Sequence, residues 1–339
     1  MTKKIIYSLV IMVVVTCLTL CLAEIIVRIF SPKHDKMQCV VPDQKYGYFM
    51  KKNFSEHYRY PGSDHQITIQ TNRWGLRGTD YDASRLSNPA VTKVLLLGDS
   101  YTFGYGVNRE DTFAYKLETL LNASGNAFLV INAGVGGWGT LQEITYAKDH
   151  FRVFKPDIIV FTFCRNDPKD DLKFSHNLYG GEKGLMRFPG KQFFRHHSHL
   201  YDFLFRVFHG DLETFLFKQK MRQKKIPFDT ARRRPFNSDR ITEEEWKRTG
   251  TYITNFYKEF LAFNTKGVVF VQSAEPWNMA MRSHLQSLSH NKNLRYIDLY
   301  DEAIILTPDK RSLPYDPHWS PAVHSLSAKK LCKVILGRE

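Results

Sequence analysis

The sequence has few cysteines, and their spacing matches no metal-binding or disulfide pattern. Only five cysteines occur in 339 residues, and no two are spaced as Cys-x-x-Cys. Two of them, Cys17 and Cys21, lie in an apolar stretch near the N-terminus, so neither a zinc site nor a disulfide framework is indicated. The chain also lacks internal repeats and low-complexity tracts. Hydrophobic residues make up 43% of it, which is enough for a sizeable core and excludes global disorder.

Long uncharged runs are also scarce, and one run near the N-terminus stands apart from the rest. Residues 5–23 carry no charge and follow Lys3 and Lys4. As a helix this run would span about 28 Å, the thickness of one hydrocarbon core. A cleaved signal peptide has a shorter apolar core and a small-x-small site, which is missing here, and neither Cys17 nor Cys21 follows a small residue as in a lipoprotein. We therefore expect residues 1–30 to form an uncleaved single-pass membrane anchor.

The orientation of this anchor is left open by its own flanking charges. Lys3 and Lys4 favour a cytoplasmic N-terminus, whereas Arg28, Lys33 and Lys36 on the other side favour the opposite.

The excess of basic residues is concentrated in one segment. Residues 168–240 hold 16 Lys and Arg against 8 Asp and Glu, and so supply +8 of the formal charge of +14. No nucleic-acid-binding motif accompanies them, so we expect no nucleic-acid partner and favour a surface near anionic lipid or an anionic polymer. This segment shows no strand alternation, which predicts a helical insertion near the mouth of the site.

This segment contains a cluster of three histidines, His196, His197 and His199, which is a candidate metal site. His196 and His197 would face opposite ways on a strand, which does not suit two ligands of one ion. We expect no metal there.

The rest of the chain divides into two parts. Residues 31–91 are polar and aromatic, with a strand-like alternation at 66–71 and a turn at 72–78, and are expected to form a stalk that packs on the main domain. From residue 92 to 339, five apolar runs alternate with helical segments. Continuous apolar strands separated by helices predict a flavodoxin-like three-layer α/β/α sandwich around a parallel sheet. The basic segment interrupts this domain.

Polar residues follow several of these strands, where ligands bind in open α/β sheets. The first strand ends in "GDSYTFG", the second in "INAGVGGWGT" and the third in "FTFCRNDP", and "LPYDPHWSP" comes late in the chain. Acyl transfer needs a nucleophile, a base that takes its proton and an acid that orients the base. Ser100, His318 and Asp316 can fill these three roles.

The same segments offer donors for an oxyanion. Gly136 and Gly137 would let a backbone N–H approach the substrate closely, and Asn166 has a side-chain amide. The N–H of Ser100, at a helix start, is a further donor.

In these blocks the chain resembles an SGNH hydrolase of the GDSL esterase/lipase superfamily, over residues 93–337 without the insertion. In that family the serine of Gly98-Asp99-Ser100 is nucleophile and oxyanion donor, and the glycine of the second block, best matched by Gly137, gives an oxyanion N–H. The third block reads Gly-x-Asn-Asp, and here Cys164 stands in place of the glycine before Asn166 and Asp167.

The last block departs from the family pattern. The family has Asp-x-x-His, whereas this chain has Asp316-Pro317-His318, which is one residue shorter. Asp316 is our candidate for the acid, with a backbone carbonyl supporting His318 as the alternative. Similar Asp-x-His-Trp pairs occur in membrane-associated branches tied to polysaccharide acylation. The anchored layout, with "TNRWGLRG" before the first strand, resembles a branch whose catalytic domain lies outside the cytoplasm, which favours a cytoplasmic N-terminus here.

The resemblance implies a membrane-anchored serine esterase acting on acyl esters, acetyl among them, of an envelope carbohydrate or lipid, with no metal or organic cofactor. An O-acyltransferase with a sugar hydroxyl as acceptor would use the same residues. A non-catalytic scaffold or polymer-binding protein on the same fold is the alternative of another class, and Cys164 and the short last block favour it.

Each of these residues also has a structural interpretation. Ser100 can cap the helix that follows it. Asp99 and Asp167 are expected to fix their loops through hydrogen bonds, and His324 to be structural or exposed. Trp138, Trp277 and Trp319 suit either a rim for sugar or acyl groups or packing against the sheet.

Overall fold

The computed structural model describes residues 2–30, 37–59, 66–176, 197–208, 242–264, 266–276, 278–289, 293–314 and 316–338. It separates into two units, one of residues 1–36 with 185–225 and one of residues 37–184 with 226–339. Most of the basic insertion, including His196, and also Trp277 lie outside the described residues. The described parts of the insertion are helical: α6 begins at Asp167 and ends at Ser175, and α8 is His199–Phe208.

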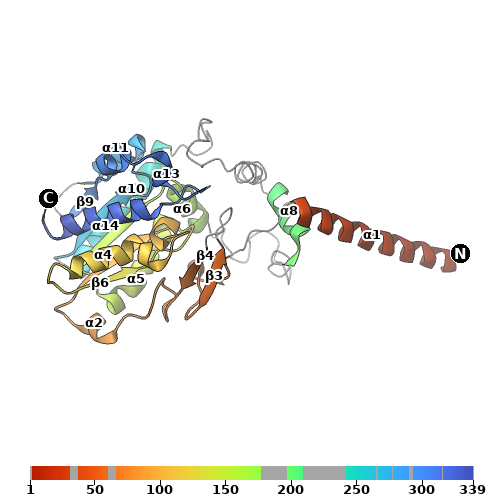
Figure 1. Cartoon of the computed structure of the whole chain (residues 1–339), viewed down its shortest axis with the longest axis horizontal. Helices are drawn as coiled ribbons and strands as arrows, with labels where there is room; N and C mark the ends of the chain where they lie inside the picture. The colour runs from red at the N-terminus through yellow and green to blue at the C-terminus, as the bar shows by residue number, and fades with distance from the viewer. Residues whose placement is uncertain are drawn as a thin grey trace. The chain divides into compact units, whose positions relative to one another are not determined.

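The first unit is built on one long apolar helix, α1 (Thr2–Phe30), shown in red in Figure 1. Its large apolar side chains are exposed along its length, and residues 3–29 are long and apolar enough to cross a membrane. Near its end the carboxylate of Glu24 accepts hydrogen bonds from Ser198 Oγ and from the backbone N–H groups of His199 and Leu200, each at 2.8 Å. Because the first N–H groups of a helix lack partners within it, Glu24 stabilises the N-terminus of α8.

The second unit contains a five-stranded sheet in the order β6-β5-β7-β8-β9, and all its pairs are parallel. Its strands are β5 (Thr92–Gly98), β6 (Phe128–Asn132), β7 (Ile158–Phe163), β8 (Val268–Ser273) and β9 (Leu294–Ile297). The predicted α/β fold with a central parallel sheet is confirmed. The chain reverses its direction of winding after β6, so the switch point lies between the carboxyl ends of β5 and β7, where ligands bind in open α/β sheets.

Helices cover both faces of this sheet (Figure 1). The helices of the unit not yet given are α2 (Ala83–Ser87), α3 (Ser100–Phe103), α4 (Phe113–Asn122), α5 (Thr140–Phe154), α10 (Glu243–Phe263), α11 (Met279–Ser287), α12 (Tyr300–Ile304), α13 (Pro308–Arg311) and α14 (Pro321–Ile335), with a short 3-10 turn at Arg109–Asp111. Successive residues of β5 point to opposite faces. Val94 and Leu96 pack in the core under α4 and α14, whereas Leu95 and Leu97 pack in the core under α5 and α10. This double burial explains why the strand is apolar throughout.

The segment before the sheet forms two antiparallel strand pairs. The first joins β1 (Val40–Asp43) to β2 (Gly47–Met50), and the second joins β3 (Ser55–Arg59) to β4 (Gln66–Gln70). The first pair belongs to the core under α5: Phe49 stacks on Trp138, with ring centroids 5.5 Å apart, and also on Tyr146. Residues 37–59 and 66–91 therefore share the core of the sheet unit.

Candidate active site

The serine of the first block lies directly after strand β5. The side chain of Asp99 accepts a hydrogen bond from the N–H of Tyr101 at 3.0 Å and so caps α3, in which Ser100 is the first residue. The structural interpretation of Ser100 as the cap is therefore wrong, because Asp99 does this instead. Gly98 has a φ of +154°, and a Cβ there would lie 2.1 Å from Thr102 Oγ1, so only glycine allows this sharp turn.

The described structure brings the three residues predicted for acyl transfer into contact. The Nε2 atom of His318 lies 2.7 Å from Ser100 Oγ, although the two residues are 218 positions apart. On the other side of the ring, Nδ1 forms a short hydrogen bond with Asp316 Oδ1. Asp316 is 7% exposed. Ser100, His318 and Asp316 are thus joined in series, in the order that a nucleophile, a base and an acid that orients the base would need.

The short last block closes as a turn around its aspartate. Asp316 Oδ1 also accepts a hydrogen bond from the backbone N–H of His318, at 3.0 Å. An aspartate that binds the N–H two residues on forms an Asx turn, and Pro317 between them fixes φ and needs no partner for an N–H. One carboxylate oxygen therefore binds both the backbone and the ring of the same histidine, which explains how a block one residue shorter still joins its aspartate to its histidine.

Two tyrosines that the sequence analysis did not single out contact the imidazole. The ring centroids of Tyr101 and Tyr105 lie 4.9 Å and 4.6 Å from that of His318. Tyr101 Oη donates to the carbonyl of Pro317 at 3.3 Å, and the Tyr105 hydroxyl lies 2.9 Å from that of Tyr58 in β3. Both tyrosines stand in the "SYTFGYG" stretch, whose aromatic residues directly after the serine were the available signal.

The loop after β6 borders the serine. A Cβ placed on Gly136 would lie 3.6 Å from Ser100 Cβ, so the loop approaches Ser100 closely. Gly137 has a φ of +81°, a conformation in which glycine is favoured. The N–H of Trp138 donates to the carbonyl of Val135 at 3.1 Å and closes the loop as a turn.

The third block keeps its turn in spite of the cysteine. The N–H of Asp167 donates to the carbonyl of Cys164 at 3.0 Å, and Asp167 Oδ2 accepts from the N–H of Cys164 at 3.0 Å. The Cys164 thiol donates to Asn166 Oδ1, and Asn166 Nδ2 donates to Asp170 Oδ2, both at 2.7 Å. Asp99 and Asp167 thus hold their loops as expected. Cys164 fits in place of the family glycine, and Asn166 is fixed on both sides of its amide.

Comparison with known proteins finds a family model that matches part of this chain. Residues 96–198 match the model of the GDSL-like lipase/acylhydrolase family. The chain carries a GDSL-like acylhydrolase domain. It is an ester-hydrolysing enzyme. No curated protein matches the chain.

Solved structures resemble the acylhydrolase at low sequence identity. The crystal structure of TesA is 9% identical, with a TM-score of 0.44, and the match covers 73% of this chain and 100% of that one. A family 3 carbohydrate esterase from Clostridium thermocellum is 14% identical, with a TM-score of 0.41 and coverages of 73% and 96%. A two-domain esterase active on acetylated mannans is 16% identical, with a TM-score of 0.43 and coverages of 73% and 50%.

Acidic side chains are buried beneath the site of the acylhydrolase. Burial raises the pKa of Asp99 and of Asp171 to about 6, and it raises the pKa of Glu143 and Asp167 well above the ordinary range. Among the described residues, Asp99, Cys164 and Asp167 are placed closely enough to ligate a metal, with ligand atoms within 4.8 Å of one another. The two loops already use these carboxylates as hydrogen-bond acceptors, which gives the cluster a structural role.

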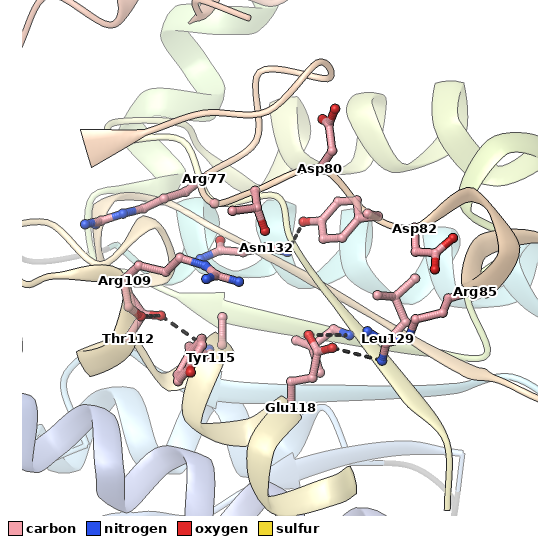
Figure 2. Close-up of a pocket in the computed structure, with 15 residues that line it drawn as sticks. Arg77, Asp80, Asp82, Arg85, Arg109, Thr112, Tyr115, Glu118, Leu129 and Asn132 are labelled. Carbon is pink, nitrogen blue, oxygen red and sulfur yellow. Dashed lines mark hydrogen bonds and ion pairs between the residues drawn. The ribbon is translucent and has the colours of Figure 1, made fainter. Parts of the chain in front are cut away.

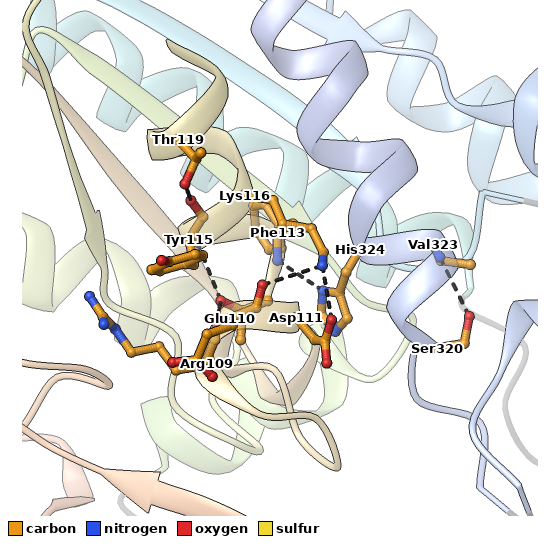
Figure 3. Close-up of polar contacts among 11 residues, drawn as sticks. Arg109, Glu110, Asp111, Phe113, Tyr115, Lys116, Thr119, Ser320, Val323 and His324 are labelled. Atoms are coloured by element: carbon orange, nitrogen blue, oxygen red, sulfur yellow. Dashed lines mark hydrogen bonds and ion pairs between the residues drawn. The ribbon is translucent and has the colours of Figure 1, made fainter. Parts of the chain in front are cut away.

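His324 is buried behind the site and has a structural role. Its Nδ1 accepts the hydrogen bond of the Phe113 N–H at 3.2 Å (Figure 3), and its ring packs on Phe113 and Trp319. Burial, with added repulsion from Arg77 and Lys116, lowers the pKa of His324 to about 3. The folded acylhydrolase therefore keeps this imidazole neutral at pH values where the unfolded chain protonates it.

This difference predicts that His324 contributes unfavourably to stability in mild acid. Below about pH 6.5 the unfolded chain binds a proton that folded His324 does not, so the contribution of His324 to the free energy of unfolding falls by about 2 kcal/mol between pH 7 and 5. His324→Asn keeps an acceptor for the Phe113 N–H and cannot titrate. The buried carboxyls favour folding in mild acid and contribute equally to both proteins. Between pH 7 and 5, the free energy of unfolding measured in urea should therefore change by about 2 kcal/mol more favourably in this variant than in the wild type, and equal changes would contradict the prediction.

The tryptophans beside the site pack inside the protein. Trp138 and Trp319 are both fully buried. Trp319 Nε1 donates to the carbonyl of Ala274, and Trp138 Nε1 donates to the carbonyl of Tyr48. The packing interpretation holds for these two residues, and neither forms an open rim.

A separate cavity of about 170 Å³ lies beside the edge strand β6 (Figure 2). Its walls come from residues 77–82, from α4 and from β6, and include Arg77, Arg109, Tyr115 and Glu118. The side chain of Glu118 pairs with Arg85 at 3.0 Å. Neither Ser100 nor His318 lines this cavity, so it is distinct from the candidate active site.

Proposed function

We propose that this acylhydrolase is a membrane-anchored serine esterase that uses Ser100, His318 and Asp316. The contact of Ser100 Oγ with His318 Nε2 at 2.7 Å supports this proposal most directly. The neutral imidazole takes the hydroxyl proton as Ser100 Oγ attacks the ester carbonyl, and Asp316 stabilises the imidazolium that forms. His318 then gives this proton to the leaving alkoxide, and an acyl-enzyme remains. A water molecule, deprotonated in turn by His318, attacks the acyl-enzyme and releases the acid and the free serine.

Three donors are proposed for the oxyanion. These are the N–H of Ser100 at the start of α3, the N–H of Gly137 and the side-chain amide of Asn166. Asn166 Nδ2 donates to Asp170, but an amide nitrogen carries two protons, so one remains for the substrate. Each such donor lowers the barrier because it meets charge that develops only in the transition state.

The substrate class we propose is an acyl ester, acetyl first, carried by an envelope carbohydrate or lipid. This choice is supported by α1, which is exposed and apolar enough to lie in a membrane. With the N-terminus in the cytoplasm, the sheet unit would lie outside it, where envelope polymers are found.

Acyl-chain profiling of the full-length protein in detergent tests the reaction. We expect turnover of p-nitrophenyl acetate above that of the butyrate and octanoate esters, and labelling by a fluorophosphonate probe. Mass spectrometry with added sugar acceptors would then distinguish free acetate from acetylated sugar, and so a hydrolase from an O-acyltransferase. The absence of both turnover and labelling, with and without acceptors, would contradict the enzymatic mechanism and favour a polymer-binding protein.

The anchor leads to a prediction for the whole chain. Because residues 3–29 form one apolar helix, the protein should stay in the membrane pellet after carbonate extraction and keep its full mass of 39.6 kDa. Alkaline phosphatase fused to the C-terminus should be active, since it works only outside the cytoplasm. A mature protein that starts near residue 30 would instead indicate a cleaved signal sequence, and an inactive fusion the opposite orientation.

A further inference from the structure

A strand from the segment before the sheet reaches the loop that borders Ser100. Tyr48, in β2, donates a hydrogen bond from its hydroxyl to the carbonyl of Gly136 at 3.2 Å. Two further bonds tie the same strand pair to this loop and to the helix that follows it: Trp138 Nε1 donates to the carbonyl of Tyr48 at 3.2 Å, and Gln142 Nε2, in the first turn of α5, donates to the carbonyl of Tyr46 at 2.8 Å. The contact with Gly136 is therefore part of a fixed junction between two segments that are about 90 residues apart.

The loop has the form of a β-turn with two possible orientations of its middle peptide. The hydrogen bond from the Trp138 N–H to the Val135 carbonyl closes it, and the φ of +81° at Gly137 is typical of a type II turn. In a type I turn the middle peptide, between Gly136 and Gly137, is rotated by about half a turn. Because both residues are glycine, the backbone itself opposes this flip only weakly.

The middle peptide contains both the acceptor of the Tyr48 bond and the N–H proposed for the oxyanion. The peptide is trans, so the Gly136 carbonyl and the Gly137 N–H point in opposite directions. A bond that holds the carbonyl toward Tyr48 therefore holds the N–H away from Tyr48. The loop borders Ser100 here, since a Cβ on Gly136 would lie 3.6 Å from Ser100 Cβ, whereas one on Gly137 would lie 2.9 Å from Tyr48 Oη.

We propose that Tyr48 is a positioning residue that holds the Gly136–Gly137 peptide in the orientation that aims the Gly137 N–H at the oxyanion. This inference rests on the proposed function. The bond also polarises the peptide and makes its N–H a better donor. Burial, followed by the nearby charges of Asp170 and Asp99, raises the pKa of the Tyr48 phenol, so Tyr48 remains a donor throughout the pH range of an esterase assay.

The test compares Tyr48→Phe with Tyr46→Phe in the full-length protein. Tyr46 belongs to the turn of the same strand pair, and its hydroxyl donates to Asp149 Oδ2 at 2.6 Å, on the side of α5. Each variant removes one hydroxyl that forms a partly buried hydrogen bond, and each keeps the ring. Removal of one oxyanion donor typically lowers kcat by about 10²–10³-fold. In Tyr48→Phe the Gly137 N–H is still present, but its orientation is no longer fixed. We therefore expect kcat to fall about tenfold, with KM within about twofold of the wild-type value. Tyr46→Phe should leave both near the wild-type values.

A tetrahedral inhibitor separates positioning from a general loss of structure. An alkylboronic acid adds to Ser100 and places an oxygen where the oxyanion forms, so its inhibition constant should rise in Tyr48→Phe by the same factor by which kcat falls. The pH profile and the melting temperature should match those of Tyr46→Phe. A change in KM alone, equal kcat values in the two variants, or unchanged boronate inhibition would overturn the role of Tyr48. Wild-type protein that neither labels nor turns over would instead contradict the proposed function itself.

Discussion

Replacing Ser100 with alanine is expected to lower ester turnover by about 10⁶-fold and to abolish fluorophosphonate labelling, because no other group replaces the attacking oxygen. The backbone should be unaffected: Asp99, and not Ser100, caps α3, so the helix keeps its start without the serine hydroxyl. The oxyanion donors also remain, which predicts a KM close to that of the wild type. The measurement is kcat on p-nitrophenyl acetate together with in-gel labelling.

A matched serine variant shows whether the effect is specific. Ser283 lies exposed on α11, where its hydroxyl bonds the carbonyl of Met279 within the same helix. Ser283→Ala should keep full turnover and full labelling. Labelling that persists in Ser100→Ala would assign the nucleophile to another serine, whereas loss of labelling in both variants would indicate a change in folding.

The sheet could be predicted from the sequence because its strands are buried on both faces. Residues such as Leu95 and Leu96 pack in opposite cores, which leaves a continuous apolar run that only a covered parallel strand produces. The early strands gave no such pattern. β1 contains Pro42, and β3 has charged side chains at Glu56 and Arg59 on opposite faces, so both are recognisable only through their antiparallel partners.

Helix α10 was missed although its start carries a clear signal. Thr242 accepts a hydrogen bond from the Glu245 N–H at 3.2 Å, and Glu245 Oε2 accepts one from the Thr242 N–H at 2.9 Å. This is a capping box, readable in the sequence as Thr-x-x-Glu ahead of an amphipathic stretch.

The sequence was sufficient to predict which residues form the candidate site, but it did not predict which of their neighbours they contact. The order of the blocks places Ser100, Asn166 and His318 near the carboxyl ends of strands, where a parallel sheet brings its loops together. The contact between Tyr48 and Gly136 depends on how a separate strand pair folds over that edge. No spacing in the sequence encodes it. The same limit applies to Trp138 and Trp319, because a sequence does not show on which side of a loop a ring is buried.

Asp316→Asn and Asp316→Ala should lower kcat by different amounts, because one oxygen of this carboxylate accepts hydrogen bonds from two donors. Oδ1 accepts hydrogen bonds from both the backbone N–H and Nδ1 of His318. In Asp316→Asn the amide oxygen would stay on that side to meet the backbone N–H, which keeps the ring proton on Nδ1. The variant then loses only the negative charge that stabilises the imidazolium, for which we expect a loss in kcat of about 100-fold.

Asp316→Ala removes the turn and the ring support together, so its kcat should fall further, by about 10⁴-fold. Asp309→Asn, in the exposed helix α13, is the matched control and should keep wild-type activity. The order wild type, Asn and then Ala is specific to an aspartate that both closes the Asp-Pro-His turn and orients the base. If both variants kept kcat within tenfold of the wild type, a backbone carbonyl or another acid would support His318 instead. Equal and large losses would indicate that the charge, and not the turn, carries the whole effect.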